Sequence, residues 1–461
     1  MQIQVNTDSL SSSILDNGSS ALHGSNSNSI DMDRIRKDSP GTTNLIHLNS
    51  AGASLIPIPV STAVMDHLKL ELEIGGYEAH AFNSEKVDAV YLSLSRLLHC
   101  KVNEIALMDN ATTAWSKLFY SLKFQPGDII LTCQSEYGSN YISYLKIAKD
   151  TGAEIAVVNN DENGAVDVTH MKQLIDSFPV GKVKLISITH IPTNGGLIND
   201  AAAIGDIAQE YNIPYLLDAC QSVGQLDLDV NKLKCSFLSG TSRKYLRGPR
   251  GVGFLYVKEE YIDQIEPVFL DIHAATWGTS VWGGPTDAPK GASNTAPIPS
   301  KAAEVGLDMY AVRPDARRFE TWEMNYANVI GLGAAVDYAL DVVGIQNIER
   351  DILEKAALFR QGLQQVHADI QLCDLGSQVQ KCGIVTWFVP GLAAADIKEA
   401  LTNGNPRINV SVSPPSSTLI DATARELPAL VRTSISYYNS REEMEIALKE
   451  IGKVITTLLQ K

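Results

Sequence analysis

A lysine and an aspartate that each follow an apolar stretch could take part in chemistry. Lys244 stands in SGTSRKYLRGPRGVGFLYV, and Asp218 ends the apolar run of YLLDACQS. A lysine amine attacks carbonyl groups once its surroundings lower its pKa. A buried carboxylate needs a cationic or hydrogen-bonding partner. Taken singly, Lys244 could be a solvated lysine and Asp218 a helix cap or a turn residue.

Taken together, the two residues suit one cofactor. One further predicted strand separates Lys244 from Asp218, so both can reach the same edge of a sheet. The lysine can hold pyridoxal 5'-phosphate as a Schiff base. The aspartate can pair with the protonated ring nitrogen, so that the ring withdraws electrons. The sequence therefore predicts pyridoxal 5'-phosphate as the cofactor.

Other predicted strand ends carry side chains that suit the same cofactor. DNATTAWSKL places Thr112 and Thr113 at the start of a helix, where amides and hydroxyls bind anions. SEYGSN places Tyr137 after another strand, where its ring can cover a planar group. Helix capping and ordinary packing are the alternatives for these residues. Because ligands bind at strand carboxyl ends in open α/β sheets, we expect them to converge.

The elements that position these residues alternate along the chain. Short β-branched runs such as VKLISITHI and IPYLLDAC are separated by helical patterns such as NDAAAIGDIAQEYN. This alternation predicts an α/β fold with a mostly parallel sheet and helices on both faces. We expect a disordered polar tail over residues 1–43, a large cofactor domain over 44–310 and a smaller α+β domain over 311–461.

Composition excludes several classes of function. The 461 residues are 44% hydrophobic and 20% charged, as in soluble enzymes. With 38 basic and 53 acidic residues, the net charge is −15, so we expect neither a nucleic-acid nor a membrane partner. No apolar run approaches a bilayer span. The six cysteines show no zinc spacing, so no metal is expected. No signal-peptide pattern is present, which favours the cytoplasm.

Five motifs in order resemble the class V aminotransferase family, over about residues 45–455. They are the Thr112–Thr113 helix start, the strand before Glu136–Tyr137, and the segments THIPTNGGLIN, LLDACQSVGQLDLDV and SGTSRKYLRGPRGVGFLYV. The resemblance implies pyridoxal phosphate fold type I, with a seven-stranded type of sheet in the large domain. It also implies a homodimer with sites near the subunit interface, to which residues 272–280 are our candidate contributors.

The resemblance implies a role for each matching cofactor residue. Lys244 would form the Schiff base, Asp218 would bind the ring nitrogen, and Gln221 would hydrogen-bond the phenolic oxygen. Tyr137 would stack on the ring where many relatives have histidine, which removes an acid–base group. The phosphate would be held by Thr112, Thr113, Thr241 and Arg243.

The resemblance also implies how an amino-acid substrate would bind. Thr193 and Asn194 fall where relatives carry an asparagine near the phenolic oxygen and the substrate. Arg432 matches the arginine that binds the substrate α-carboxylate, a task for which a bidentate guanidinium is suited. The alternative for Arg432 is a surface salt bridge.

The reaction is predicted from softer features. Desulfurases of this family carry a cysteine in the segment that here reads NPRINVSVSPPSSTLIDATARELPALVR, without cysteine. IHLNSAGAS, ELEIGGYEAHAF and the RRFE segment resemble the hercynylcysteine sulfoxide lyase and isopenicillin N epimerase branch. We therefore expect a lyase that cleaves the side chain of a modified amino acid, at a C–S bond or at a C–C bond leaving alanine. Lys244 would be the base.

Other reactions stay open at this point. An aminotransferase or an epimerase is the main alternative, because both share the first proton abstraction at Cα. A cysteine desulfurase ranks behind them. A protein without cofactor and a nucleotide-binding α/β enzyme are more distant, since Lys244, Asp218 and Gln221 are intact and no glycine-rich nucleotide motif follows a strand.

Overall fold

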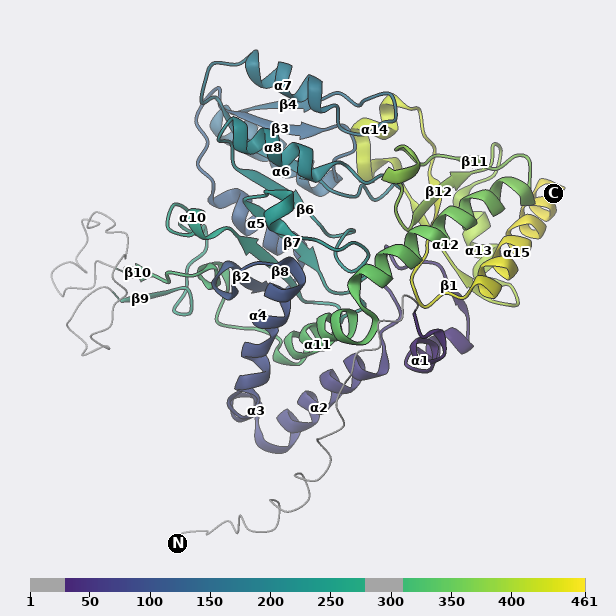
Figure 1. Ribbon diagram of the computed structural model, residues 1–461, viewed down its shortest axis with the longest axis horizontal. Coiled ribbons are helices and arrows are strands. Elements are labelled where there is room, and N and C mark those ends of the chain that lie inside the picture. Colours follow the sequence, from purple (N-terminus) through teal and green to yellow (C-terminus); the bar gives the residue numbers. More distant parts are fainter. Residues whose placement is uncertain (1–29, 278–309, 461) are drawn as a thin grey trace, which may run out of the picture.

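The computed structural model describes residues 30–277 and 310–460, and its largest element is a seven-stranded sheet (Figure 1). The strand order is β2-β8-β7-β6-β5-β3-β4. Only β8 runs antiparallel to its neighbours. The α/β fold predicted from the sequence, with a mostly parallel sheet, is confirmed. The strands are β2 (Ile105–Met108), β3 (Ile129–Cys133), β4 (Glu154–Val158), β5 (Val183–Thr189), β6 (Tyr215–Asp218), β7 (Phe237–Thr241) and β8 (Gly253–Val257).

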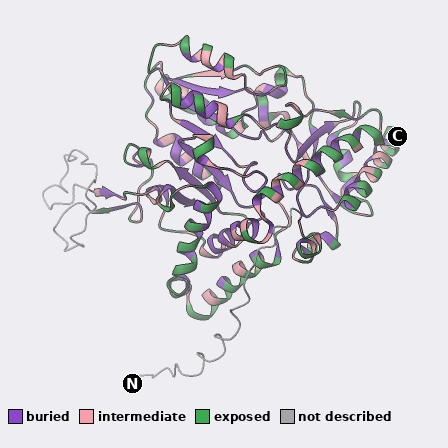
Figure 2. Cartoon of the chain, in the orientation of Figure 1, coloured by how far each residue is buried: buried purple, intermediate pink, exposed green. Residues whose placement is uncertain are grey.

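Both faces of this sheet are covered, because successive residues of each strand point to opposite sides. Leu217 of β6 packs into the core with α4, α7 and α8, whereas Leu216 packs with α5 and α6. Figure 2 shows the strands buried and the outer helix surfaces exposed. The helices are α4 (Ser84–Leu98), α5 (Ala111–Ser121), α6 (Gly138–Thr151), α7 (Val168–Asp176), α8 (Ala201–Glu210), α9 (Val230–Leu233) and α10 (Glu259–Ile262).

The C-terminal part forms a smaller antiparallel sheet in the order β11-β12-β15-β14. Trp387 of β12 and Phe359 lie in its core, with 0% of each exposed. Its strands are β11 (Gln371–Leu372), β12 (Ile384–Phe388), β14 (Ser411–Ser413) and β15 (Leu430–Ser434). Its helices are α12 (Ile345–Val366), α13 (Ala394–Asn403), α14 (Leu419–Ala424) and α15 (Arg441–Leu459).

The N-terminal part of the described chain crosses over to this smaller unit. The strand β1 (Ile46–His47) pairs in parallel with β13 (Ile408–Asn409). The helix α2 (Ile58–Ile74) then leads through α3 (Gly76–Phe82) into α4 of the large unit. The chain from β1 to α4 therefore links the two units, and the domain boundaries stay a prediction.

Residues 30–43 are folded, so the expectation of a disordered tail is wrong for them. They form α1 (Met32–Lys37) and the 3-10 helix η1 (Pro40–Thr43). Ile35 is buried, and the Arg36 guanidinium lies 2.8 Å from the Glu443 carboxylate. The polar composition of this segment predicted disorder, because the contacts that order it are few and Glu443 is distant in sequence. Residues 1–29 lie outside the described residues.

One helical stretch has the length and apolar composition of a membrane span, contrary to our expectation from the sequence. It comprises α11 (Tyr326–Asp337) and the π-helix η6 (Tyr338–Val343). The first of these packs against both α2 and α4. Its apolar character is therefore explained by burial between helices.

Candidate active site

A cavity of about 230 Å³ opens at the carboxyl ends of the parallel strands. The structure brings most of the predicted residues to its wall. Those that line it are Thr112, Tyr137, Thr193, Asp218, Gln221, Thr241, Arg243 and Lys244. Ligands of open α/β sheets bind at this edge, so the fold and the predicted residues identify the same place.

Lys244 follows β7 and lies within the buried wall of the cavity. Burial lowers the pKa of its amine, and the charges of Arg243 and Arg432 lower it further. Cys220 and Asp218 act in the opposite direction. A lowered pKa leaves more of the amine unprotonated, which is the form that attacks a carbonyl and that accepts a proton.

Asp218 ends β6 with a buried carboxylate that two neutral groups orient. The backbone N–H of Cys220 donates to its Oδ1 at 2.9 Å, and Asn140 Nδ2 donates to its Oδ2 at 3.0 Å. Neither donor carries a charge. The carboxylate is thus fixed in direction and fits a cationic partner, as a protonated pyridine nitrogen would be.

The phosphate group of pyridoxal 5'-phosphate would lie at the start of α5. The cap residue of this helix is Asn110, whose Oδ1 accepts the backbone N–H of Thr113 at 2.9 Å. Thr112 faces the cavity, whereas Thr113 is not among its lining residues. Arg243 adds a positive charge, and its guanidinium donates to the carbonyl of Gly52. A helix start beside an arginine fits a phosphate.

Gln221 and Tyr137 line the part of the cavity where the pyridine ring of the cofactor would lie. Gln221 Nε2 donates to the carbonyl of Ala51 at 3.2 Å, while its Oε1 is buried without a partner among the described residues. This buried oxygen, on the cavity wall, is available to accept a hydrogen bond from a bound group. Tyr137 is 37% exposed, so its ring is accessible from the cavity side. These groups fit pyridoxal phosphate.

Arg432 lies behind the cavity wall, on β15 of the smaller sheet. Its guanidinium donates to Thr193 Oγ1 and to the Thr193 carbonyl, and its Nε is buried without a partner among the described residues. Burial lowers its pKa to about 10, so the side chain remains a cation at neutral pH. It can therefore bind a carboxylate that enters beside Thr193, although it does not itself line the cavity.

Asn194 does not line the cavity either. Its Nδ2 donates to the Pro414 carbonyl at 3.1 Å, and its own carbonyl accepts Thr386 Oγ1 at 2.9 Å. These contacts join the large unit to the smaller one. The role of Asn194 toward substrate stays a prediction, as do the roles of Thr113 and Arg432.

Several lining residues were missed from the sequence. Thr189 ends β5, and Cys220 stands between Asp218 and Gln221, so their positions after apolar runs carried a usable signal. The N-cap position of Asn110 carried another. The full set of missed lining residues is Asn110, Ala111, Thr189, Ile191 and Cys220.

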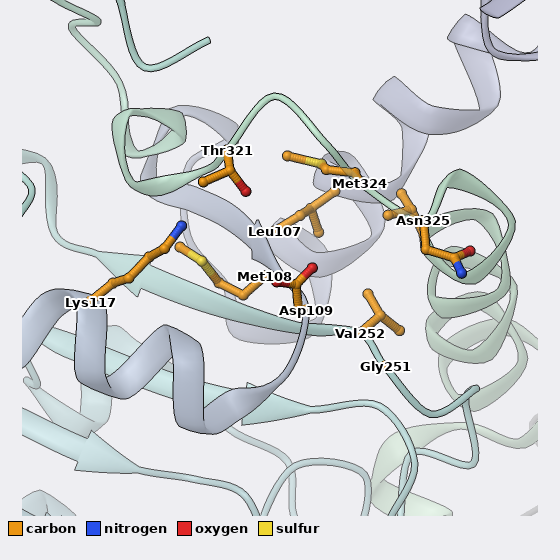
Figure 3. Close-up of a pocket in the computed structure, with 10 residues that line it drawn as sticks. Leu107, Met108, Asp109, Lys117, Gly251, Val252, Thr321, Met324 and Asn325 are labelled. Atoms are coloured by element: carbon orange, nitrogen blue, oxygen red, sulfur yellow. The ribbon is translucent and has the colours of Figure 1, made fainter. Parts of the chain in front are cut away.

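A second hollow near the start of α5 is not part of this site. Figure 3 shows Lys117, Asp109 and Met324 around it. Its volume is about 10 Å³, about the space of one water molecule. The Lys117 amine donates to the Phe319 carbonyl at 3.0 Å. This hollow is therefore too small for a cofactor, and it contains none of the predicted site residues.

Similar proteins carry the names of sulfur enzymes. A relative from Methanothermobacter thermautotrophicus, named a probable cysteine desulfurase, is 25% identical over 432 residues, covering 91% of this chain and 97% of its own. The cysteine desulfurase of Thermococcus onnurineus superposes with a TM-score of 0.78 at 24% identity, over 93% and 98% of the chains. A variant of C-DES, a cystine C–S lyase, has glycine covalently linked to its PLP cofactor. It superposes with a TM-score of 0.74 at 20% identity, over 90% and 98%.

These names contradict our expectation about the reaction. We had placed cysteine desulfurases behind side-chain lyases of modified amino acids, aminotransferases and epimerases, because residues 405–432 contain no cysteine. Two relatives that match over nine-tenths of the chain, from Methanothermobacter thermautotrophicus and Pyrococcus abyssi, are named probable cysteine desulfurases. They do not support the branch of hercynylcysteine sulfoxide lyases and isopenicillin N epimerase either. The absence of one cysteine from this segment therefore did not predict the reaction correctly.

The family assignment rests on almost the whole described chain. The family model described as Aminotransferase class-V matches residues 46–277 and 274–446. Its matched region contains both sheets and all the residues that we predicted for the site. The chain therefore belongs to the class V aminotransferase family.

Proposed function

We propose that this protein removes the sulfur of cysteine and leaves alanine. The cofactor predicted from the sequence, pyridoxal 5'-phosphate, is confirmed by the family and by its C-DES neighbour. The observation that carries the proposal is the meeting of Lys244 and Asp218 in one cavity, in a chain whose relatives are named cysteine desulfurases. When bound, the cofactor would withdraw electrons from the bonds at the substrate Cα.

Residues of this chain would bind the substrate, transfer protons and hold the cofactor ring. Arg432 binds the substrate carboxylate and Thr193 orients the guanidinium. Lys244, with its lowered pKa, takes the Cα proton and returns a proton to carbon. Asp218 holds the cation of the ring nitrogen. The proposal is supported by the positions of these residues, because Thr193, Asp218 and Lys244 line the cavity and the Arg432 guanidinium contacts Thr193.

The segment in which the family resemblance implies a sulfur-accepting cysteine contains no cysteine in this chain. Residues 415–424 form the 3-10 helix η8 (Pro415–Thr418) and α14, and the Asp421 N–H donates to the Gln134 carbonyl of the large unit at 3.1 Å. Cys220 is the cysteine that lines the described part of the cavity. Burial and Asp218 raise the pKa of its thiol, so it stays protonated and a weak nucleophile.

We therefore propose a free thiol as the acceptor. Cysteine and a thiol RSH give alanine and the persulfide RSSH. The Cβ–S bond breaks, an S–S bond forms, and no oxidant is needed. The support is the absence of cysteine from residues 405–432 together with the protonated state of the Cys220 thiol.

The test is product analysis with purified holoenzyme, cysteine and dithiothreitol. We expect alanine and sulfide in equal amounts, at a rate that rises with dithiothreitol concentration, and neither product from the Lys244→Ala variant. Pyruvate and ammonia in place of alanine would mean β-elimination and would overturn the proposal. Turnover that is independent of added thiol would overturn the free-thiol acceptor only.

A homodimer is also proposed. The helices α2 and α3 expose large apolar side chains to solvent, and surfaces of this kind mark protein contacts. The exposed residues are Met65, Leu68, Leu72, Tyr77 and Phe82. Residues 272–280, our candidates for an interface contact, are described only as far as Trp277.

A further inference from the structure

We infer that Glu136 is a positioning residue for Asp218, and that it acts through the side chain of Asn140. The inference rests on the cofactor and the family, and it adds a residue outside the set of cavity-lining groups. Glu136 stands between β3 and α6 and is 2% exposed. Buried carboxylates are rare unless they are paired or hydrogen-bonded, so its partners need an explanation.

Glu136 is surrounded by hydrogen-bond donors. Its Oε1 accepts Tyr137 N–H at 2.9 Å and Thr189 Oγ1 at 2.5 Å, and its Oε2 accepts Thr189 N–H at 3.0 Å and Thr132 Oγ1 at 3.2 Å. These donors are neutral, and they fix the carboxylate plane. These hydrogen bonds favour the ionised form of the carboxylate and partly offset the effect of burial, which favours the neutral form.

Asn140 connects this carboxylate to the cofactor site. Its Nδ2 donates to Glu136 Oε1 at 2.9 Å and to Asp218 Oδ2 at 3.0 Å. An amide nitrogen carries two protons, so the bridge uses both of them. Glu136 thereby determines which end of the Asn140 amide faces Asp218. With the amide reversed, its oxygen would face the Asp218 carboxylate and repel it.

The charge of Glu136 has a second effect at the same place. Two carboxylates joined by one neutral amide form an anionic pair, and an anion nearby stabilises a cation at the ring nitrogen. The carboxylate pair therefore favours the protonated ring nitrogen more than Asp218 would alone. This is the protonation state in which the ring withdraws electrons most strongly.

Apart from the Asp218 carboxylate, the buried titratable groups around Glu136 are neutral near pH 7. Burial raises the pKa of the Cys133 thiol and of the Tyr144 and Tyr215 hydroxyls. Burial, reinforced by Asp218, raises the pKa of Glu136 itself to about 7. Since an acid is charged above its pKa, the effect of Glu136 on the ring nitrogen should be full above pH 8 and fade below pH 6, about one unit on either side.

The experiment uses holoenzyme reconstituted with ¹⁵N-labelled cofactor. The readouts are the chemical shift of the ring nitrogen between pH 5.5 and 9 and the rate of cofactor loss on dialysis. For Glu136→Gln we expect a shift toward the unprotonated nitrogen above pH 7, little change below pH 6, and cofactor loss faster by about tenfold. Neither readout needs a substrate, so failure of the proposed desulfurase reaction would leave it unaffected.

Two comparisons separate positioning from loss of stability. Glu320→Gln is the matched control, because Glu320 is also buried and accepts hydrogen bonds from Tyr91 Oη at 2.7 Å and from Leu107 N–H at 2.8 Å, away from the cavity. It should lower Tm without moving the ring nitrogen signal. In an Asn140→Ala background, Glu136→Gln should add less than about twofold to the dialysis rate, because the bridge is already lost.

The inference is overturned if Glu136→Gln keeps the wild-type ring nitrogen signal across the pH range, or if its effect is fully additive with Asn140→Ala. Should Glu136→Gln fail to fold, Asn140→Ala and Glu136→Asp provide the same test. Asn140→Ala must then move the ring nitrogen signal above pH 7. The shorter Glu136→Asp side chain keeps the charge and must move it less.

Discussion

Lys244 and Lys117 are both buried lysines with pKa values lowered by burial, and only their surroundings separate their roles. Lys117 lies beside the Phe319 carbonyl, and the charges of Asp109, Asp271 and Glu320 favour its protonated form. Lys244 lies on the cofactor cavity, where Cys220 and Asp218 favour its protonated form and the nearby cations Arg243 and Arg432 oppose it. The same residue type therefore makes a structural hydrogen bond in one place and is a candidate base in the other.

This contrast gives a prediction for the two lysines. Lys244→Ala should abolish the absorbance band of the covalently bound cofactor and lower kcat by about 10³-fold or more, because attachment and proton transfer are lost together. Lys117→Met should keep the band while changing Tm. Absorbance spectra after dialysis distinguish the two. Retention of the band in Lys244→Ala would contradict the role of this lysine.

Arg432 and Thr193 allow a prediction about substrate binding. Arg432→Gln removes the cation that would bind the carboxylate, so KM for cysteine should rise by about tenfold to hundredfold with a smaller change in kcat. Thr193→Val removes the hydroxyl that the guanidinium contacts and leaves the carbonyl contact, so its effect should be smaller in the same direction. Steady-state kinetics measure both. A loss of kcat with unchanged KM would place Arg432 elsewhere in the reaction.

At the scale of elements, the docking of residues 415–424 on α6 depends on a close approach at Gly138. A Cβ at this position would lie 2.5 Å from the Ser416 carbonyl oxygen. Ser416 and Ser417 of η8 thus lie against the start of α6, the helix that follows Tyr137. The atom that an added Cβ would meet belongs to the backbone of Ser416, so a residue larger than glycine at position 138 must displace η8.

Gly138→Ala should therefore loosen residues 415–424. We expect faster amide hydrogen exchange in this segment, with little change in α12 or α15. Gly76→Ala is the matched control, because Gly76 also begins a helix and an added Cβ would meet nothing within 4 Å. That control should be neutral or slightly stabilising. Equal exchange in both variants would show that the contact at Gly138 has no influence on the segment.

The elements also show what the sequence could predict. Asp218 follows an apolar run with a clear local pattern and was placed correctly at the end of β6, and the further strand predicted between Asp218 and Lys244 is β7. The pairing of β1 with β13 joins residues far apart in the chain, and no local pattern indicates it. The bridge from Glu136 through Asn140 to Asp218 was missed for the same reason. Local periodicity predicts elements, whereas contacts between distant elements need coordinates.

The prediction of the reaction failed for a different reason, which concerns the whole molecule. The same cofactor-binding residues serve enzymes that catalyse many different reactions. Lys244 and Asp218 therefore predict the cofactor but not the product of the reaction. We gave weight to one missing cysteine and to short segments such as RRFE. The RRFE segment folds as the 3-10 helix η5 (Ala316–Phe319) and its flank, in which Glu320 accepts hydrogen bonds in the core. Its residues are explained by packing, and they carry no evidence about the substrate.

The assembly of the molecule gives the last prediction. Leu72 of α2 is 87% exposed and Phe82 of α3 is 73% exposed, and together with Tyr77 they form an apolar surface on adjoining helices. If a second copy covers this surface, Leu72→Glu with Phe82→Glu should convert the dimer to a monomer in analytical ultracentrifugation, because burying two carboxylates is costly. Val180→Glu, at a fully exposed apolar residue before β5, is the matched control and should leave the sedimentation coefficient unchanged. A double variant that sediments like the wild type would show that this surface is not the interface.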